Sequence, residues 1–317
     1  MHGGGTRSPD DWRTLFTRLK AAGLSGVHVG GGDPVMLSAA AHEAGLVFSR
    51  WTWMMNRSSD DWVKTYHPEW FTVSREGNSS LTHPPYVPYY QWLCPTREAV
   101  RAYLVDECAA VARDPGVDQV HMDYIRHCDV ILPRALWATY HLVQDHEMPA
   151  YDFCYCDACR EGFQRRTGKD PLALPDPPSD AAWRRFRWDS VTGLVREVAR
   201  AVHAARKPLT AAVFPTPAIA RREVRQAWDE WPLDAAFPML YHAFHAEPVE
   251  WIGRSVREDR AAIHARFPIY AGLHVPDLPP DDLARAMSDS LRAGAAGVSL
   301  YEVNDLTDAH LARLATS

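Results

Sequence analysis

The sequence has no long apolar run, no block of like charges and few cysteines. No window of its 317 residues approaches the ~18 consecutive apolar residues of a membrane helix, so we expect no membrane partner. With 34 basic and 40 acidic residues and a formal net charge of −6, binding to a phosphate backbone has no electrostatic support, and we expect no nucleic-acid partner. Six cysteines are too few for a disulfide scaffold.

The chain also has no Gly/Ser linker and no break in composition, so we expect residues 1–317 to form a single domain. Its first residues, Met1-His2-Gly3-Gly4-Gly5-Thr6, lack the apolar core of a signal peptide. We therefore expect a cytoplasmic protein, and removal of an earlier leader stays open as the alternative. No organic cofactor is expected, and a homo-oligomer is compatible with this composition.

Short apolar segments of strand length alternate with helical stretches along the whole chain. There are seven such segments, at residues 27–29, 46–55, 117–125, 209–214, 234–241, 268–275 and 297–303. Alternation of this kind predicts an α/β fold of parallel strands, and about eight units close most economically into a (β/α)8 TIM barrel. The first strand would then lie in residues 1–5, short or truncated, because residues 10–22 already read as the first helix.

Two long loops interrupt this alternation of strands and helices. The aromatic-rich residues 56–94 follow the third predicted strand, and a second long stretch, Pro-rich at 172–179, follows the fourth. Loops that extend the carboxyl ends of barrel strands commonly carry the functional groups. We therefore expect functional side chains at the strand ends and in these two loops.

The fourth predicted strand carries the strongest catalytic signal. Strand side chains alternate between faces, so Gln119, His121 and Asp123 would share the interior of the barrel, while residues 120, 122 and 124 would pack under helices. Asp123 then lies at the carboxyl end, where barrel enzymes place their chemistry. The alternative is a structural carboxylate that pairs with Arg126 or caps the following turn.

Residues 118–126, together with His67-Pro68-Glu69-Trp70 and Phe237-Pro238-Met239-Leu240-Tyr241, resemble the family-10-like glycosyl hydrolases. That group is thought to consist of TIM-barrel enzymes that act on glycans. The resemblance implies hydrolysis of a glycosidic bond in a carbohydrate substrate. It also maps the family's strand-four carboxylate onto Asp123.

Glycoside hydrolysis normally needs two carboxyl groups, ~5 to 9.5 Å apart. The fifth, sixth and seventh strands end without an acid, whereas the eighth ends in Tyr301-Glu302-Val303-Asn304-Asp305. Glu302 is therefore the leading partner of Asp123, with Asp305 behind it. Because Val298 and Leu300 share its side of the strand, an outward-pointing Glu302 stays open, as does the choice of which carboxyl is the acid.

Aromatic rings and histidines gather near the same strand ends. Flat apolar faces beside polar groups suit sugar rings, and imidazoles hydrogen-bond sugar hydroxyls, although each ring could equally serve packing. No His-x-His or His-Glu-x-x-His spacing supports a catalytic metal. The predicted substrate-binding residues are Trp51, Trp53, Asn56, Trp92, His121, Arg126, Tyr241, His242 and His274.

Four cysteines form a second pattern. Cys94-Pro95-Thr96, followed by Cys154-Tyr155-Cys156-Asp157-Ala158-Cys159, is similar to the zinc-binding pattern of family 42 β-galactosidases. Four thiolates hold Zn²⁺ tetrahedrally and leave no position for water, so such a zinc is structural. The alternative is a set of reduced loop thiols. This resemblance stops at the active site, because the Asn-Glu pair of that family is replaced by Met122-Asp123.

These observations predict a glycoside hydrolase-like enzyme with Asp123 and Glu302 as its carboxylates and a structural zinc. Two alternatives stay open. One is a barrel that has lost catalysis and only binds carbohydrate. The other is a lyase or isomerase acting on a sugar acid, in which Arg126 would bind the carboxylate of the substrate.

Overall fold

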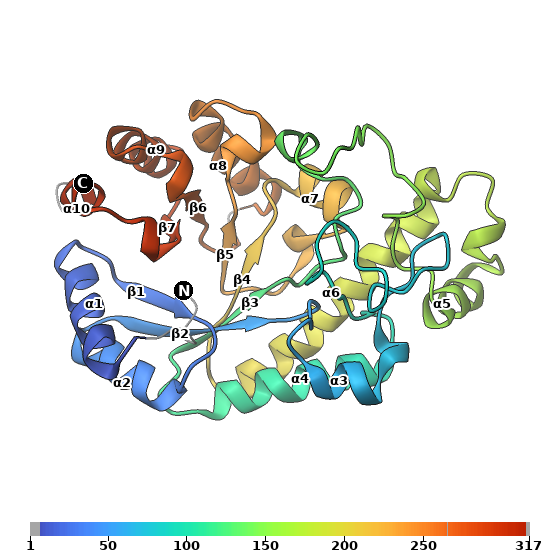
Figure 1. Ribbon diagram of the computed structural model, residues 1–317, viewed down its shortest axis with the longest axis horizontal. Coiled ribbons are helices and arrows are strands. Elements are labelled where there is room, and N and C mark those ends of the chain that lie inside the picture. Colours follow the sequence, from blue (N-terminus) through green and yellow to red (C-terminus); the bar gives the residue numbers. More distant parts are fainter. Residues whose placement is uncertain (1–6, 265, 315–317) are drawn as a thin grey trace.

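The computed structural model describes residues 7–264 and 266–314. Parallel strands form a curled central sheet, and the helices lie outside the curl (Figure 1). The described strands are β1 (Gly26–Val29), β2 (Val47–Trp53), β3 (Gln119–Asp123), β4 (Leu209–Val213), β5 (Ala235–Pro238), β6 (Tyr270–His274) and β7 (Gly297–Tyr301). Each of the seven predicted segments overlaps one of these strands, so the predicted alternation is confirmed.

The strands pair in chain order. β1 to β5 form a five-stranded parallel sheet, and β6 pairs with β7 in a second parallel sheet. Two isolated parallel bridges, Ala236 with Ile269 and Met239 with Gly272, join β5 to β6. At the second bridge a Cβ on Gly272 would lie 2.7 Å from the Pro238 carbonyl oxygen, so the close approach requires glycine. The predicted first strand, residues 1–5, lies outside the described residues.

Side-chain caps mark the start of several helices. Ser8 and Asp11 form a capping box before the first helix, and the Asp180 side chain accepts a hydrogen bond from the Trp183 amide at the start of the longest. The described α-helices are α1 (Pro9–Ala21), α2 (Pro34–Glu43), α3 (Asp61–Tyr66), α4 (Glu98–Arg113), α5 (Asp157–Thr167), α6 (Ala181–Ala204), α7 (Pro217–Val224), α8 (Glu250–Ala262), α9 (Pro280–Arg292) and α10 (Asp308–Leu314).

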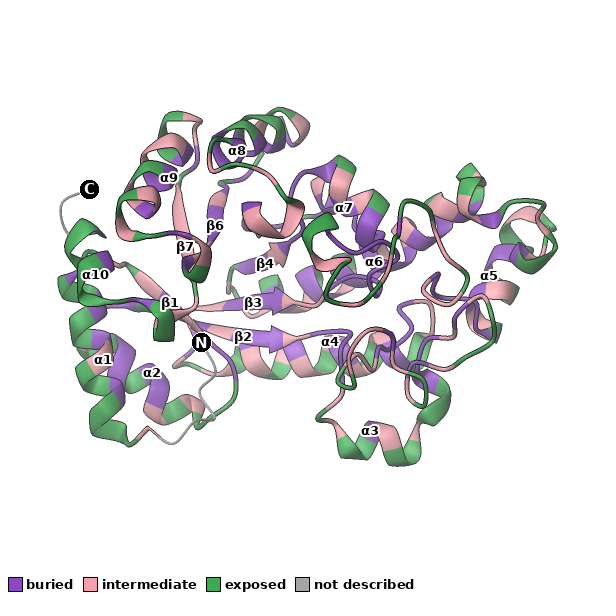
Figure 2. Ribbon diagram, turned by 45° about the horizontal axis from the view of Figure 1, so that its top comes forward, coloured by how far each residue is buried: buried purple, intermediate pink, exposed green. Residues whose placement is uncertain are grey.

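Two apolar clusters fill the space between sheet and helices. The larger contains Val120 and Met122 of β3 and the facing sides of α4 and α6, and the other joins β1 and β2 to helices such as α1, α8 and α9. Figure 2 shows buried residues along the strands and exposed residues on the outer faces of these helices. The predicted alternation along β3 is thereby confirmed for residues 119–123. No helix among residues 7–264 and 266–314 is long and apolar enough to cross a membrane.

The two long loops pack against each other beside the sheet. The Tyr155 amide donates to the Val73 carbonyl at 2.7 Å, and Ser74 forms an antiparallel bridge with Phe153. Beneath them, the fully buried Asp152 is ion-paired with Arg187 of α6. Paired loops of this kind extend the wall of the sheet beyond its carboxyl edge (Figure 1).

Candidate active site

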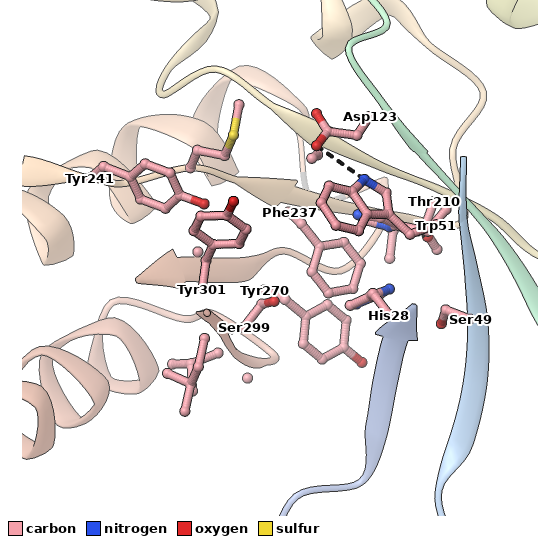
Figure 3. Close-up of a pocket in the computed structure, with 18 of the residues that line it drawn as sticks. His28, Ser49, Trp51, Asp123, Thr210, Phe237, Tyr241, Tyr270, Ser299 and Tyr301 are labelled. Carbon is pink, nitrogen blue, oxygen red and sulfur yellow. Dashed lines mark hydrogen bonds between the residues drawn. The ribbon is translucent and has the colours of Figure 1, made fainter. Parts of the chain in front are cut away.

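A cavity of about 1020 Å³ lies inside the curl of the sheet. Every described strand contributes to its lining, because inward-facing side chains alternate along each one. Figure 3 shows this lining from β1 through β7, with rings from three different strands side by side. The lining residues labelled there are His28, Ser49, Trp51, Asp123, Thr210, Phe237, Tyr241, Tyr270, Ser299 and Tyr301.

Asp123 lies in this cavity at the carboxyl end of β3. Its Oδ2 accepts a hydrogen bond from Trp51 Nε1 at 3.1 Å, shown as the dashed line in Figure 3. Its Oδ1 accepts from the Tyr124 amide at 2.6 Å. Burial raises the pKa of Asp123 above its ordinary value, although both hydrogen bonds and Arg126 oppose that shift. The carboxyl group therefore keeps its proton to higher pH than an exposed aspartate.

Three tyrosines surround this carboxyl group. The rings of Tyr241 and Tyr301 lie 6.1 Å apart, and their hydroxyls point toward one another below Asp123 (Figure 3). Burial raises the pKa of both phenols, and the charge of Asp123 raises it further. The third, Tyr124, was predicted to face the helices, and this is wrong. It lines the cavity, because β3 ends at Asp123 and the chain turns there with a φ of 52°.

Deeper in the cavity, the rings of two histidines pack against each other at an interplanar angle of 37°. The rings of His28 and His121 are 4.0 Å apart, and Nδ1 of His121 is hydrogen-bonded to Thr210 Oγ1 at 2.8 Å. Burial lowers the pKa of His28 to about 3 and that of His121 well below its ordinary value, so both rings are neutral at pH 7. The sequence analysis missed His28, although it alternates with Val27 and Val29 in a predicted strand.

Arg126, a predicted substrate-binding residue, also lines the cavity, and its ionic partner is Asp129. Its Nη1 donates to Asp129 Oδ2 at 2.9 Å and to the His127 carbonyl at 3.1 Å. The expected alternative, a salt bridge between Asp123 and Arg126, is therefore wrong. The acid that the sequence analysis missed is Asp129, which is 3% exposed and shares the cavity wall.

The remaining predicted residues fall into two groups. Trp53 and Tyr241 line the cavity with Trp51. The lining formed by the described residues does not include the others, which are Asn56, Trp92, His242, His274 and Glu302. Asn56 and Trp92 are buried and bridge two strands of loop backbone.

Two of these residues nevertheless lie next to the cavity wall. His274 Nδ1 is 2.6 Å from Asp277 Oδ2, and its ring lies 5.1 Å from that of Tyr241. Glu302 follows Tyr301 directly, and its Oε1 accepts a hydrogen bond from Asn304 at 3.1 Å. His274 and Glu302 are therefore neighbours of the tyrosines that line the cavity, although neither lines it.

The four cysteines of the predicted metal site come together. Their sulfur atoms all lie within 4.8 Å of one another, and all four residues are buried. Cys94 Sγ is 3.4 Å from Cys159 Sγ and 3.5 Å from Cys156 Sγ. Cys94 precedes α4, Cys154 and Cys156 precede α5, and Cys159 lies in the first turn of α5. Four converging thiols are a donor set that fits a tetrahedral metal ion.

Comparison with known proteins identifies the fold. No family model and no curated protein match the sequence. The PgaB (BpsB) glycoside hydrolase domain from Bordetella bronchiseptica matches with a TM-score of 0.70 and 12% identity, over 97% of this chain and 93% of that one. The α-L-fucosidase isoenzyme 2 from Paenibacillus thiaminolyticus matches with a TM-score of 0.64 and 14% identity, over 98% and 46%. A β-galactosidase from Bacillus circulans sp. alkalophilus gives 0.61 and 12%, over 95% and 50%.

These structures show an α/β fold, a curled parallel sheet, that this chain shares with glycoside hydrolases. At 12 to 14% identity the likeness concerns the fold alone. The chain spans about half the length of the fucosidase and of the galactosidase. The predicted class of fold is confirmed at this level.

Proposed function

We propose that the protein is a glycoside hydrolase with Asp123 as its proton donor, built as a single (β/α)8-barrel domain of the family-10-like type. One observation carries the proposal. Asp123 lies at the carboxyl end of a parallel strand, inside a cavity of about 1020 Å³, hydrogen-bonded to an indole and a backbone amide instead of a cation. The fold that the chain shares with solved glycosidases supports this choice.

The chemistry follows from the proton on Asp123. A carboxyl group whose pKa is raised by burial keeps its proton to higher pH than an exposed aspartate, and it can donate this proton to the glycosidic oxygen as that bond breaks. The substrate is then a carbohydrate, with sugar rings stacked on Trp51 and Trp53. The hydroxyl of Tyr241 and the wall formed by Arg126 supply hydrogen bonds to sugar hydroxyls.

Glu302 is the second carboxylate in this proposal. It follows Tyr301, and after burial the charges of Glu302 and Asp123 are the next two causes that raise the pKa of that phenol. Because the charges of both acids act on the Tyr301 phenol, both acids lie near it. This supports a position for the scissile bond of the substrate between the two acids. In hydrolysis the proton of Asp123 goes to the leaving oxygen, while Glu302 attacks the anomeric carbon or takes a proton from the attacking water.

The other predicted residues would support the residues that contact the substrate. His121 would hold the floor of the cavity through Thr210, and His242 and His274 would support the rim near Tyr241. Asn56 and Trp92 would fix the loop that carries the aromatic wall. None of these roles requires a charged imidazole.

We further propose that Cys94, Cys154, Cys156 and Cys159 hold one Zn²⁺. Their buried, mutually close thiols supply all four ligands, so the ion would stabilise the paired loops without taking part in hydrolysis. Its place between the loop before α4 and the start of α5 supports a structural role. The proton-transfer steps above use none of these cysteines.

The test is hydrolysis of a panel of aryl glycosides of both anomeric configurations. We expect release of the aryl group from at least one of them, and a fall in kcat/KM of roughly 10²- to 10⁴-fold in Asp123→Asn. The exposed Asp145→Asn is the matched control and retains wild-type activity. Unchanged hydrolysis by Asp123→Asn, with the same thermal midpoint as the wild type, would contradict the proposal.

A further inference from the structure

We infer that Arg126 and Asp129 together form a subsite for an uncharged sugar ring, and that Asp129 makes the cavity select neutral sugars over sugars that carry a carboxylate. This inference rests on the proposed function and specifies its substrate class. Arg126 and Asp129 form a pair of opposite charges on the cavity wall, and the proposed proton transfer uses neither of them.

The guanidinium is fixed in place. Its Cζ lies 4.7 Å from the ring centroid of Trp92 and 4.8 Å from that of Phe214, and the side chain is 7% exposed. Cations over aromatic faces are held by the ring quadrupole, and arginine stacks particularly well. Arg126 therefore cannot swing away from Asp129 to meet a substrate.

Asp129 is fixed equally well. Its side chain is 4% exposed, and its backbone carbonyl accepts a hydrogen bond from the Tyr86 hydroxyl at 2.9 Å. The same hydroxyl accepts from Gln144 Nε2 at 2.8 Å, and this amide also donates to the Val130 carbonyl at 3.0 Å. The Asp129 carboxylate is thus held in its ion pair with the Arg126 guanidinium.

The pair keeps donors and an acceptor available. Among the described residues, Nε and Nη2 of Arg126 and Oδ1 of Asp129 have no hydrogen-bond partner, and both side chains line the cavity. A donor beside an acceptor matches sugar hydroxyls, each of which donates and accepts. Sites built to hydrogen-bond a substrate discriminate strongly, because an unmatched ligand leaves their polar groups unpaired.

The charges on this wall oppose an acidic sugar. Among the described residues that line the cavity, Arg126 is the one arginine or lysine, and Asp129 neutralises it. Asp123 adds a negative charge whenever it is ionised. A substrate carboxylate at Arg126 would lie beside Asp129 and near Asp123, so repulsion would offset its attraction to the guanidinium. This argues against the sugar-acid alternative, in which Arg126 binds the carboxylate of the substrate.

The experiment measures binding, which does not require turnover. Wild-type protein is titrated by calorimetry and ligand-observed NMR with glucose and glucuronate glycosides, and with galactose and galacturonate glycosides. We expect the neutral member of at least one pair to bind at least about 10-fold more tightly. Asp129→Asn keeps the shape of the side chain but removes the negative charge that neutralises Arg126. The ratio of neutral-sugar affinity to uronide affinity should then fall by about 10-fold or more, because the uronide binds more tightly.

Asp145→Asn, in the same loop but exposed, is the control for removal of one negative charge and should leave the preference unchanged. A wild-type protein that binds the uronides as well as the neutral sugars, or that binds neither, would overturn the inference even if Asp129→Asn did not fold. So would an unchanged preference in folded Asp129→Asn. Selective binding without hydrolysis would leave the subsite standing and remove the proposed hydrolase.

Discussion

The cysteine cluster and the cavity around Asp123 differ in how far their functional groups are closed off from solvent. The four thiols are 0 to 3% exposed and close on one another, so nothing from solvent can enter between them. The cavity, by contrast, leaves Asp123 half-buried, with its carboxyl group on the lining. Figure 1 shows α5, which carries Cys159, at the edge of the molecule, away from the strands. In the functions proposed above, the first region stabilises the fold and the second binds a substrate.

The two regions also differ in how far apart their parts lie in the chain. Three of the cysteines fall within six consecutive residues, 154–159, whereas the proposed acids are at positions 123 and 302. Short spacing lets local backbone bring ligands together. A pair of acids from distant strands depends on the curl of the whole sheet.

The largest effect that tests this comparison is expected at Glu302. Glu302→Gln keeps the shape of the side chain but removes the second carboxylate, so kcat should fall by roughly 100-fold or more. The measurement is steady-state hydrolysis of the best aryl glycoside, with azide added to rescue activity. Full activity in Glu302→Gln would remove the proposed pair and leave Asp123 in need of another partner; exposed Glu76→Gln is the control.

The next effect is expected at the thiols. Wild-type protein should contain one equivalent of zinc by elemental analysis, and Cys156→Ser should contain much less. Because binding free energy is also folding free energy, the thermal midpoint should fall by about 10 °C or more. Cys108→Ser, buried but outside the cluster, is the control for loss of a buried thiol and should keep its zinc. Metal-free wild-type protein of full stability would contradict the site.

A smaller effect is expected at Glu223, which lies behind Asp129. Burial, with a contribution from Asp129, raises its pKa from 4.5 to about 8 in the folded protein. The unfolded chain loses this proton at lower pH, so stability falls as pH rises from 4.5 through about 8. Glu223→Gln should therefore gain on the order of 5 kcal/mol over wild type at pH 8.5 and little at pH 4.

The measurement for Glu223 is urea unfolding between pH 4 and pH 9. Glu76→Gln, an exposed acid, should leave the pH dependence unchanged. Parallel curves for wild type and Glu223→Gln over this range would show that Glu223 is ionised in the folded protein. The cysteine cluster should not contribute to the difference, since both proteins keep it.

The smallest effect is expected at Trp51. Its indole donates to Asp123 and lowers the pKa of that carboxyl group. Trp51→Phe removes this hydrogen bond, so the pKa of Asp123 should rise further and the alkaline limb of the pH profile should move to higher pH, by up to about one unit. Trp53→Phe is the matched control on the same strand. A shift to lower pH would contradict the assignment of Asp123 as proton donor.

The sequence predicted what local pattern determines. Alternating apolar segments predicted the seven strands, and period-two alternation placed His121 and Asp123 on the inner face. The close spacing of three cysteines indicated a metal site, and the resemblance to family 42 β-galactosidases added Cys94 to it. The sequence did not predict where β3 ends. Tyr124 adopts a positive φ without being glycine, a conformation that no periodicity encodes, and this turn sends its ring into the cavity.

The partner of Arg126 was missed for a related reason. Asp129 lies three residues further on, and only the path of the loop brings it to the guanidinium. His28 was missed because a four-residue strand gives little evidence for which face a residue takes. The position of Glu302 relative to Asp123 depends on contacts between strands far apart in the chain, and the amino-acid pattern of either strand alone carries no such information.

The buried Asp152 has a consequence for any attempt to transplant these loops. It lies two positions before Cys154, is ion-paired with Arg187 of α6, and lies 3.9 Å from Arg225 just after α7. A carboxylate buried without its cation costs about 3 to 5 kcal/mol. A host scaffold that received the cysteines without both arginines would inherit that penalty, so the module to move is the loops together with the helical positions that neutralise them.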